Sequence, residues 1–183
     1  MESVVRQLKS LTNTQIATIG IARSVTKVMV NTFLPYEDFV KSARLLDWKR
    51  LGKQRVEAWQ ILRALFGETK GWRNHPATQL WSGYEKLLCE YGIAICDEWI
   101  RRGYHDTMRE KFIAVHSTLP DCGKPDWLGE SSFHLSHQSN LKRKNPDKYS
   151  FPCSDKLPYK WKDKLGWFTI EKGKRIYESE SKV

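Results

Sequence analysis

Residues 46–66 have the sequence LDWKRLGKQRVEAWQILRALF, and this stretch decides the fold. Its apolar residues recur at helical spacing, which predicts an amphipathic helix from about residue 47 to residue 66, ended by Gly67. The apolar face predicted to pack in a core holds Leu51, Ala58, Trp59, Leu62, Leu65 and Phe66. The opposite, polar face holds Lys49, Arg50, Lys53, Glu57 and Gln60.

Glu57 is a single carboxylate among the cations of this polar face. In the commoner interpretation it forms a solvated ion pair with Lys53, worth about 0.3–0.5 kcal/mol. In the functional interpretation Arg50 and Lys53 contact phosphates, and Glu57 does acid–base or electrostatic work at a sugar. Arg55 falls within the apolar face, so we expect it to be paired or bound.

The remaining pattern predicts further helices over residues 36–45, 77–102 and 131–144, with Gly103 ending the second of them. Residues 166–178, GWFTIEKGKRIYE, predict a small hairpin that turns at Lys172–Gly173. We therefore expect an all-α fold, a compact single-domain helical bundle with a small C-terminal β-hairpin. The predicted organisation is an N-terminal extension at 1–28, a helical domain at 29–166 and a C-terminal tail at 167–183.

Composition narrows the class of protein. The 183 residues carry a net charge of +10, which favours a polyanionic partner, and the eight tryptophans argue against disorder. No apolar run reaches the roughly 18 residues of a membrane span, so we expect no membrane partner. The four cysteines form no CxxC pair, which indicates a reducing, intracellular setting.

Two more segments suit contact with a nucleic acid. In TKGWRNHP (69–76), Trp72 is able to stack on a base or pack in the core, and Arg73 and Asn74 are able to contact phosphates or base edges. In SSFHLSHQSNLKRK (131–144), small polar residues precede a basic run. His134 and His137 are three apart, but no further ligand stands at a convincing spacing, so we expect no metal site.

Several stretches together carry a family resemblance: LD (46–47), RVE (55–57), KGWRNHP (70–76), RRGY (101–104) and ESSFHLSHQSNL (130–141). From Met29 to about Lys162 the chain resembles the pyrimidine-dimer DNA glycosylase/AP lyase family of the phage endonuclease V type and its bacterial homologues. The resemblance implies a compact helical enzyme that needs no metal or cofactor. It also implies a flipped nucleotide, a Schiff base to an N-terminal amine, and strand cleavage by β-elimination.

The resemblance assigns residues as well. Glu57 matches the catalytic glutamate, with Asp47 as the second choice, and the nucleophile is the amine of Val30. Residues and resemblance together predict DNA contacts from Arg50, Lys53, Arg55, Trp72, Arg73, Asn74, His75, His134, His137, Gln138, Lys142 and Trp161. The expected partner is double-stranded DNA with damaged or abasic nucleotides. It would be bound by a cytoplasmic monomer in a bacterial or phage-infected cell. The alternative is a non-catalytic nucleic-acid-binding module on the same fold.

The chain departs from the family pattern at its start, because the first amine belongs to Met1, far ahead of the matching region. Translation from Met29 with removal of that methionine would free the Val30 amine, and cleavage of residues 1–28 would also leave a free amine near residue 30. Otherwise Lys53 supplies the amine, or lyase activity is absent. The domain-like sequence MVNTFLPYEDF favours the first of these.

Overall fold

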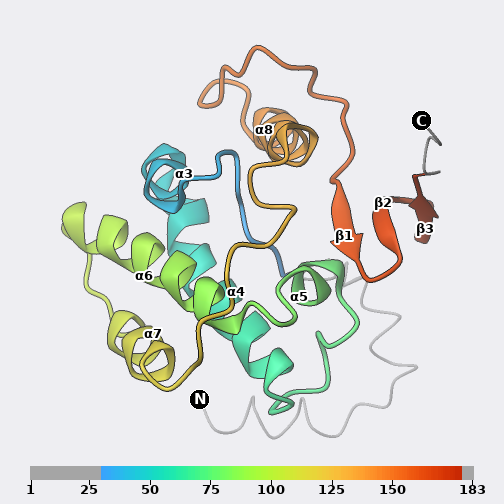
Figure 1. Ribbon diagram of the computed structural model, residues 1–183. Helices are drawn as coiled ribbons and strands as arrows, with labels where there is room; N and C mark the ends of the chain where they lie inside the picture. Colours follow the sequence, from blue (N-terminus) through green and yellow to red (C-terminus); the bar gives the residue numbers. More distant parts are fainter. Residues whose placement is uncertain (1–29, 179–183) are drawn as a thin grey trace, which may run out of the picture.

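The computed structural model describes residues 30–178, so the predicted extension at 1–28 lies outside the described residues. Six helices form the main body of this part, and a small antiparallel sheet follows them at its C-terminal end (Figure 1). This confirms the predicted fold class. In order, the elements are α3 (Phe39–Leu45), α4 (Trp48–Leu65), α5 (Pro76–Leu80), α6 (Glu85–Arg101), α7 (Arg109–His116), α8 (Ser131–Lys144), β1 (Trp161–Asp163), β2 (Gly166–Glu171) and β3 (Lys174–Tyr177).

Helix α4 forms as its pattern predicts. Its N-cap is Asp47, whose side chain accepts a hydrogen bond from the Arg50 amide. The apolar face packs on α6, and Gly52 permits the closest approach. A Cβ on Gly52 would lie 2.9 Å from the Trp99 ring of α6, so no larger residue fits there without a shift of that ring.

Two sequence predictions about the helices need correction. The helix predicted over 77–102 is two helices, α5 and α6, because the chain turns at Gly83, where φ is +84°. The turn is held by a hydrogen bond from the Gly83 amide to the Glu85 side chain. Helix α7 was not predicted at all, whereas α8 has the predicted bounds.

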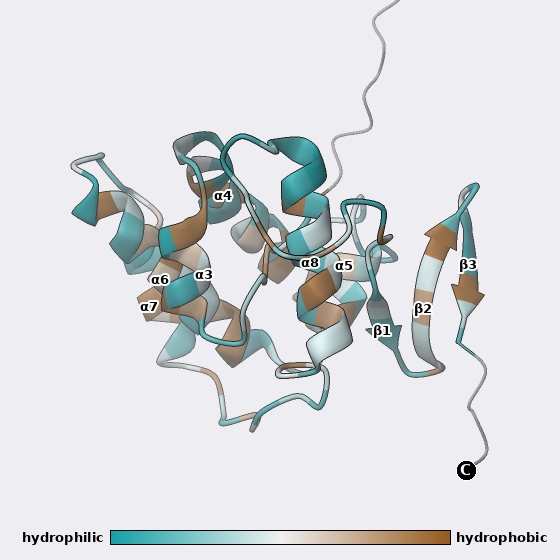
Figure 2. Cartoon of the chain, turned by 90° about the horizontal axis from the view of Figure 1, so that it is seen from above, coloured by the Kyte–Doolittle hydropathy of each residue, from teal (hydrophilic) through white to brown (hydrophobic). Residues whose placement is uncertain are grey.

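The sheet has the order β1-β2-β3, with both pairs antiparallel. Its second hairpin turns at Lys172 and Gly173, whose φ values are +47° and +79°, as a tight two-residue hairpin turn requires. The predicted hairpin is therefore confirmed, and β1 adds a strand that the sequence did not predict. The sheet stands at one side of the helices, with β1 nearest to them and β3 outermost (Figure 2).

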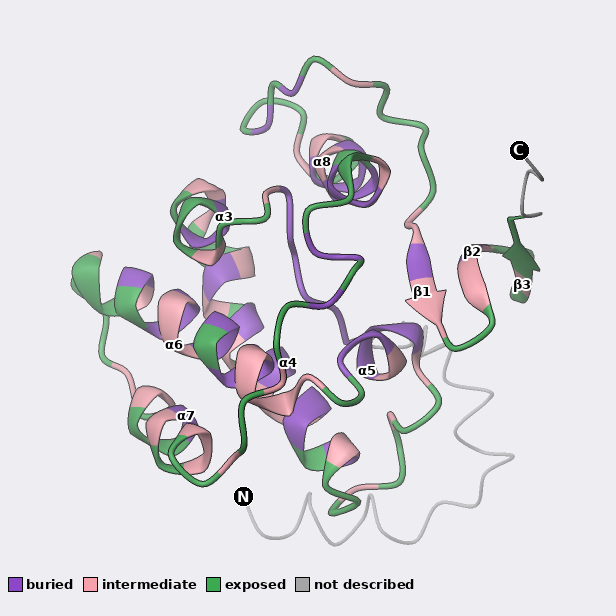
Figure 3. Cartoon of the chain, viewed as in Figure 1, coloured by how far each residue is buried: buried purple, intermediate pink, exposed green. Residues whose placement is uncertain are grey.

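Residues 30–35 form a segment ahead of α3 that belongs to no helix or strand and is buried along its whole length (Figure 3). Its backbone is held by side chains from distant elements. The Phe33 amide donates to Gln54 of α4 at 2.9 Å, and the Leu34 amide donates to His137 of α8 at 3.2 Å. These bonds fix the start of the described chain between α4 and α8, beside the candidate site.

Candidate active site

A pocket of about 480 Å³ opens where the buried segment meets the polar face of α4. Residues far apart in the sequence line it. They come from the segment at 30–33, from α4, from the turn before α5, from the end of α8 and from the chain leading into β1. They are Val30, Asn31, Phe33, Lys49, Arg50, Lys53, Glu57, His75, Lys144, Tyr159 and Trp161.

Glu57 is the acidic group of this pocket and is only 3% exposed. Gln54 donates to its Oε2 at 2.7 Å, and the Lys53 ammonium lies 3.1 Å from its Oε1. Burial raises the pKa of Glu57 above its usual range, although Lys53, the Asn31 backbone amide and Gln54 oppose the shift. The predicted ion pair with Lys53 therefore exists, but it is buried at the carboxylate end.

The start of the described chain lies next to this carboxylate. The backbone amide of Asn31 interacts with the Glu57 carboxylate, and Val30, one residue earlier, lines the same pocket. Glu57 and Val30 were predicted as a catalytic pair, and the structure brings them together although they are separated in sequence.

Four cations surround the acid: Lys49, Arg50, Lys53 and Lys144 all line the pocket. Burial lowers the pKa of Lys144, and the nearby charges of Arg50, Arg143 and Lys53 lower it further. Arg50 is paired with Asp47 and Lys53 with Glu57, but the four cations outnumber these two acids, so this rim is suited to bind phosphate groups.

Three rings form the other side of the pocket. The ring centroids of Tyr159 and Trp161 are 5.5 Å apart, and those of His75 and Trp161 are 6.3 Å apart. The His75 Nδ1 accepts the Ala77 amide at 3.2 Å, which caps α5 and fixes the imidazole. Trp161 is only 4% exposed, so it also packs in the core.

Comparison with known protein families gives a match to part of the chain. Residues 30–111 match the family model described as pyrimidine dimer DNA glycosylase. This match supports the family resemblance. No curated protein and no solved structure matches the chain.

The matched region contains both Val30 and Glu57, and it ends before α8 and the sheet. It supports a general role as a pyrimidine dimer DNA glycosylase and a DNA substrate. The glycosylase-like region thus supplies the acid and most of the cations of the pocket, whereas Lys144, Tyr159 and Trp161 come from beyond it.

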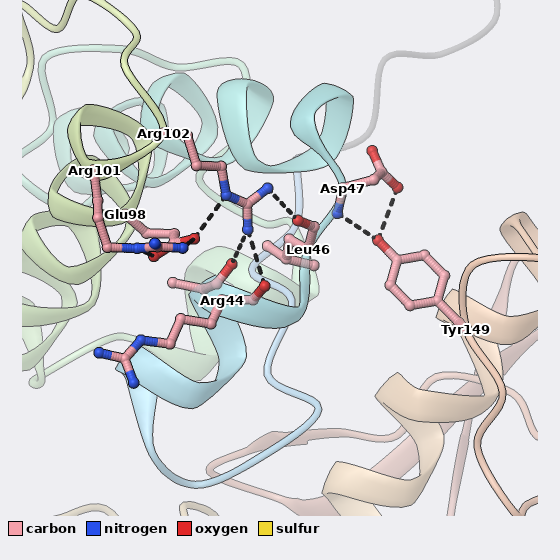
Figure 4. A network of polar contacts seen from close by, with 8 residues as sticks. Arg44, Leu46, Asp47, Glu98, Arg101, Arg102 and Tyr149 are labelled. Atoms are coloured by element: carbon pink, nitrogen blue, oxygen red, sulfur yellow. Dashed lines mark hydrogen bonds and ion pairs between the residues drawn. The ribbon is translucent and has the colours of Figure 1, made fainter.

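Asp47, the second-choice catalytic acid, does not line the pocket that contains Glu57. Besides capping α4, it accepts a hydrogen bond from the Tyr149 hydroxyl at 2.8 Å, and its own amide donates to that hydroxyl at 2.9 Å (Figure 4). Burial would raise the pKa of Asp47, but the hydrogen bonds from Arg50 and Tyr149 outweigh it and hold the pKa low. These contacts give Asp47 a structural role.

Arg55 is paired, as its place in the apolar face predicted. Its guanidinium bonds Asp106 and lies 4.2 Å from the centre of the Trp99 ring. It does not line the pocket, so the DNA contact predicted for it has no support from its position. Arg73 and Asn74 are exposed near the pocket-lining His75, and Trp72 is half-buried with its ring 5.5 Å from that of His75.

Four residues of the α8 segment point to the interior rather than to a ligand. His134 Nδ1 lies 2.8 Å from the Leu34 carbonyl, and Gln138 donates to the Pro35 carbonyl at 2.8 Å. His137 is fully buried, and Lys142 donates to the carbonyls of Phe151 and Cys153. Their predicted DNA contacts are not supported, because these polar groups hold backbone instead.

Among residues 30–178, no group of three or more His, Cys, Asp or Glu side chains is arranged to hold a metal ion. Nor does any helix in that part of the chain combine the length and apolar character needed to cross a membrane.

The sequence prediction missed five pocket residues: Asn31, Phe33, Lys49, Lys144 and Tyr159. Lys49 was recognisable, since it shares the polar face of α4 with Glu57. Lys144 ends the basic run of residues 131–144, and Tyr159 is an aromatic neighbour of Trp161 in a basic segment, so both also had a local signal. Asn31 and Phe33 had none, because only the tertiary fold brings the first residues of the described chain into the pocket.

Proposed function

We propose that this protein is a DNA repair glycosylase with AP-lyase activity on pyrimidine dimers or abasic sites. The observation that carries the proposal is the shared pocket of Val30 and Glu57, rimmed by cations. A buried carboxylate with a raised pKa beside cations is the arrangement that acid–base chemistry next to phosphates needs.

The proposed reaction uses the Val30 amine as nucleophile. Its nitrogen bonds to C1′ of the damaged nucleotide while the base leaves; the C1′–O4′ bond then breaks, O4′ gains a proton, and the open sugar is held as a Schiff base. At an abasic site the amine condenses with the C1′ aldehyde of the open sugar, and water leaves. Glu57 then takes the C2′ proton, a C2′–C3′ double bond forms, and the C3′–O bond breaks with the phosphate as leaving group. An α-amine has a pKa of about 7.7–8.0 against about 10.4 for lysine, so a useful fraction is unprotonated near neutrality.

The rest of the pocket has matching roles. Lys49, Arg50 and Lys144 would neutralise phosphates on either side of the lesion, and the aromatic wall would contact a displaced nucleotide. Lys53 is a poor alternative nucleophile, since its side-chain nitrogen is already held 3.1 Å from Glu57 Oε1 in an ion pair.

Borohydride trapping on duplex DNA with one abasic site tests this proposal. We expect a covalent adduct from protein that begins at Val30, with the modified residue mapped to Val30 by mass spectrometry. The full chain, whose Val30 nitrogen is an amide, should trap far less. Cleavage should persist in EDTA, which separates the lyase from a metal-dependent nuclease. Absence of an adduct from protein beginning at Val30 would remove the Schiff-base mechanism.

The alternative function, a non-catalytic nucleic-acid-binding module, is favoured by the cationic rim alone. It predicts tight, strongly salt-dependent binding of DNA with no strand cleavage by either form of the protein. N-terminal sequencing of the natural protein bears on both functions, because retention of residues 1–28 would leave no amine at Val30.

A further inference from the structure

One buried amide side chain connects the proposed acid to the segment that carries the proposed nucleophile. Gln54 of α4 is fully buried and makes three hydrogen bonds. Its Oε1 accepts the Phe33 amide at 2.9 Å and the Tyr91 hydroxyl at 2.6 Å. Its Nε2 donates to Glu57 Oε2 at 2.7 Å.

The surroundings fix the orientation of this amide. The Phe33 backbone amide can only donate, so the Gln54 atom that faces it must be the oxygen. Tyr91 supports the same orientation. It is fully buried, and burial together with the charge of Glu57 raises the pKa of its hydroxyl well above the usual range, so the hydroxyl keeps its proton. The NH₂ group of Gln54 must therefore face Glu57.

This orientation makes the two oxygens of Glu57 unequal. Oε2 lies against an N–H donor and serves as an acceptor, whereas Oε1 lies beside the Lys53 ammonium. A proton on Oε2 would meet the Gln54 NH₂ group and weaken that hydrogen bond. The arrangement favours Oε1 as the oxygen that gains and loses the proton.

We propose that Gln54 is a positioning residue, which holds Glu57 Oε2 as a permanent acceptor and directs proton exchange to Oε1. The same amide holds Phe33, three residues from Val30, so one side chain sets the geometry of both the acid and the segment bearing the amine. The proposal rests on the catalytic role proposed for Glu57, and it is new in giving that role a partner that touches no substrate.

The first experiment follows the Glu57 carboxyl directly by ¹³C NMR in the full chain, with its resonance assigned by Glu57→Gln. We expect Gln54→Met to raise the pKa of Glu57 relative to the parent, because a hydrogen bond that stabilises the carboxylate is lost. Gln60→Met, on the same helix and with its side chain only partly buried, is the matched control and should leave that pKa unchanged.

A second variant separates positioning from support of the core. Tyr91→Phe removes one donor to Gln54 but leaves the Phe33 amide, so the amide keeps its orientation. It should lower stability while leaving the pKa of Glu57 at the parent value. A folded Gln54→Met protein in which Glu57 titrates as in the parent would overturn the proposal.

Gln54→Glu covers the case in which Gln54→Met does not fold, since it keeps an acceptor for both donors. It should make residues 54 and 57 titrate as a coupled pair, with the last proton lost at higher pH than in the parent. An unchanged titration of Glu57 would overturn the proposal here as well.

Activity supplies an independent readout. In protein with a free Val30 amine, Gln54→Met should slow strand cleavage about 10²-fold and move the acid limb of the pH–rate profile upward. A shifted pKa of Glu57 in protein that never traps an adduct would overturn the proposed lyase and keep the assignment of Gln54.

Discussion

Two buried glutamates on neighbouring helices have opposite environments. Glu57 on α4 and Glu98 on α6 are 3% and 4% exposed. Glu98 accepts two hydrogen bonds from Arg101, at 2.7 and 2.8 Å, and one from Arg102 at 2.6 Å. Glu57 has one lysine, the side-chain amide of Gln54 and the backbone amide of Asn31. Two guanidinium groups therefore compensate the Glu98 carboxylate, whereas Glu57, which lies deeper in the protein, has weaker compensation.

The ion pairs of Glu98 have a structural role. Arg102 also donates to the carbonyls of Arg44 and Leu46 at the end of α3, so the ion pair joins α6 to α3 (Figure 4). Hydrogen bonds from Arg101 are the largest influence on the pKa of Glu98 and, with Arg102, hold it below its usual range. The pKa of Glu57 is raised instead. A buried acid with incomplete compensation is the one to suspect of a chemical role.

The largest expected difference between the two acids is in catalysis. Glu57→Gln should lower single-turnover cleavage at an abasic site by about 10²–10⁴-fold, because a proton carrier at the sugar is lost. Glu98→Gln, assayed where it is folded, should cleave at nearly the parent rate. Both are measured in protein with a free Val30 amine, and a Glu57→Gln protein as fast as the parent would refute the role of that residue.

The Glu98 ion pairs should contribute to the stability of the fold. Glu98→Gln should lower the free energy of unfolding by about 2–3 kcal/mol, because Arg101 and Arg102 lose a charged acceptor. The exposed pair of Arg63 and Glu68 is the matched control, and Glu68→Gln should cost less than about 1 kcal/mol. Urea unfolding measures both variants, and equal losses in the free energy of unfolding would contradict the structural role of Glu98.

The sequence predicted these regions unequally. Helix α4 was predicted because a helical period is a local property, whereas its N-cap Asp47 was predicted only as the approximate helix start and as the second-choice acid. Glu57 stood out for the same reason, as an acid on a basic face. The Lys53 partner of Glu57 was predicted, but the role of Gln54 was not, because Gln54 is oriented by Phe33 and Tyr91, which are 21 and 37 residues away.

The polar residues of α8 show the opposite failure. His134 and His137 have polar neighbours in the sequence and were predicted to contact DNA. In the structure they hold the Leu34 backbone, from positions 100 and 103 residues away. Residue type shows that such a side chain needs a polar partner, but only the packing of α8 on the buried segment decides that the partner is backbone.

His137 provides a third buried group for the comparison, since its Nδ1 accepts the Leu34 amide and the rings of Phe133, Tyr159 and Trp161 pack around it. Burial lowers its pKa to about 3 from an ordinary 6.5, so the folded protein binds fewer protons than the unfolded one between these values. The free energy of unfolding should fall by about 1.4 kcal/mol per pH unit as the pH drops below 6.5.

Urea unfolding at pH 7 and pH 5 measures this contribution above the range in which most carboxyl groups titrate. His137→Gln should show a smaller loss between the two values, because residue 137 no longer titrates. His116→Gln is the control, since His116 is a partly exposed histidine of α7, and it should keep the parent slope. The same slope in all three proteins would contradict a neutral, buried His137.

The smallest expected effect is on the pH dependence of stability, to which the two glutamates contribute with opposite sign. The pKa of Glu57 is raised, so the folded protein binds the extra proton, and stability from Glu57 is lost as pH rises through the window between 4.5 and the raised value. The pKa of Glu98 is lowered, so its contribution is present above 4.5 and is lost as pH falls through the folded value.

Unfolding of Glu57→Gln and Glu98→Gln against the parent at a series of pH values tests this. Relative to the parent, Glu57→Gln should gain stability as pH rises, whereas Glu98→Gln should lose its deficit as pH falls. Glu57 should change the free energy of unfolding with pH less than His137 does, because Lys53 and Gln54 oppose the effect of burial on its pKa. If Glu57→Gln instead lost stability relative to the parent as the pH rose, Glu57 would be as well compensated as Glu98, and the contrast between the two regions would fail.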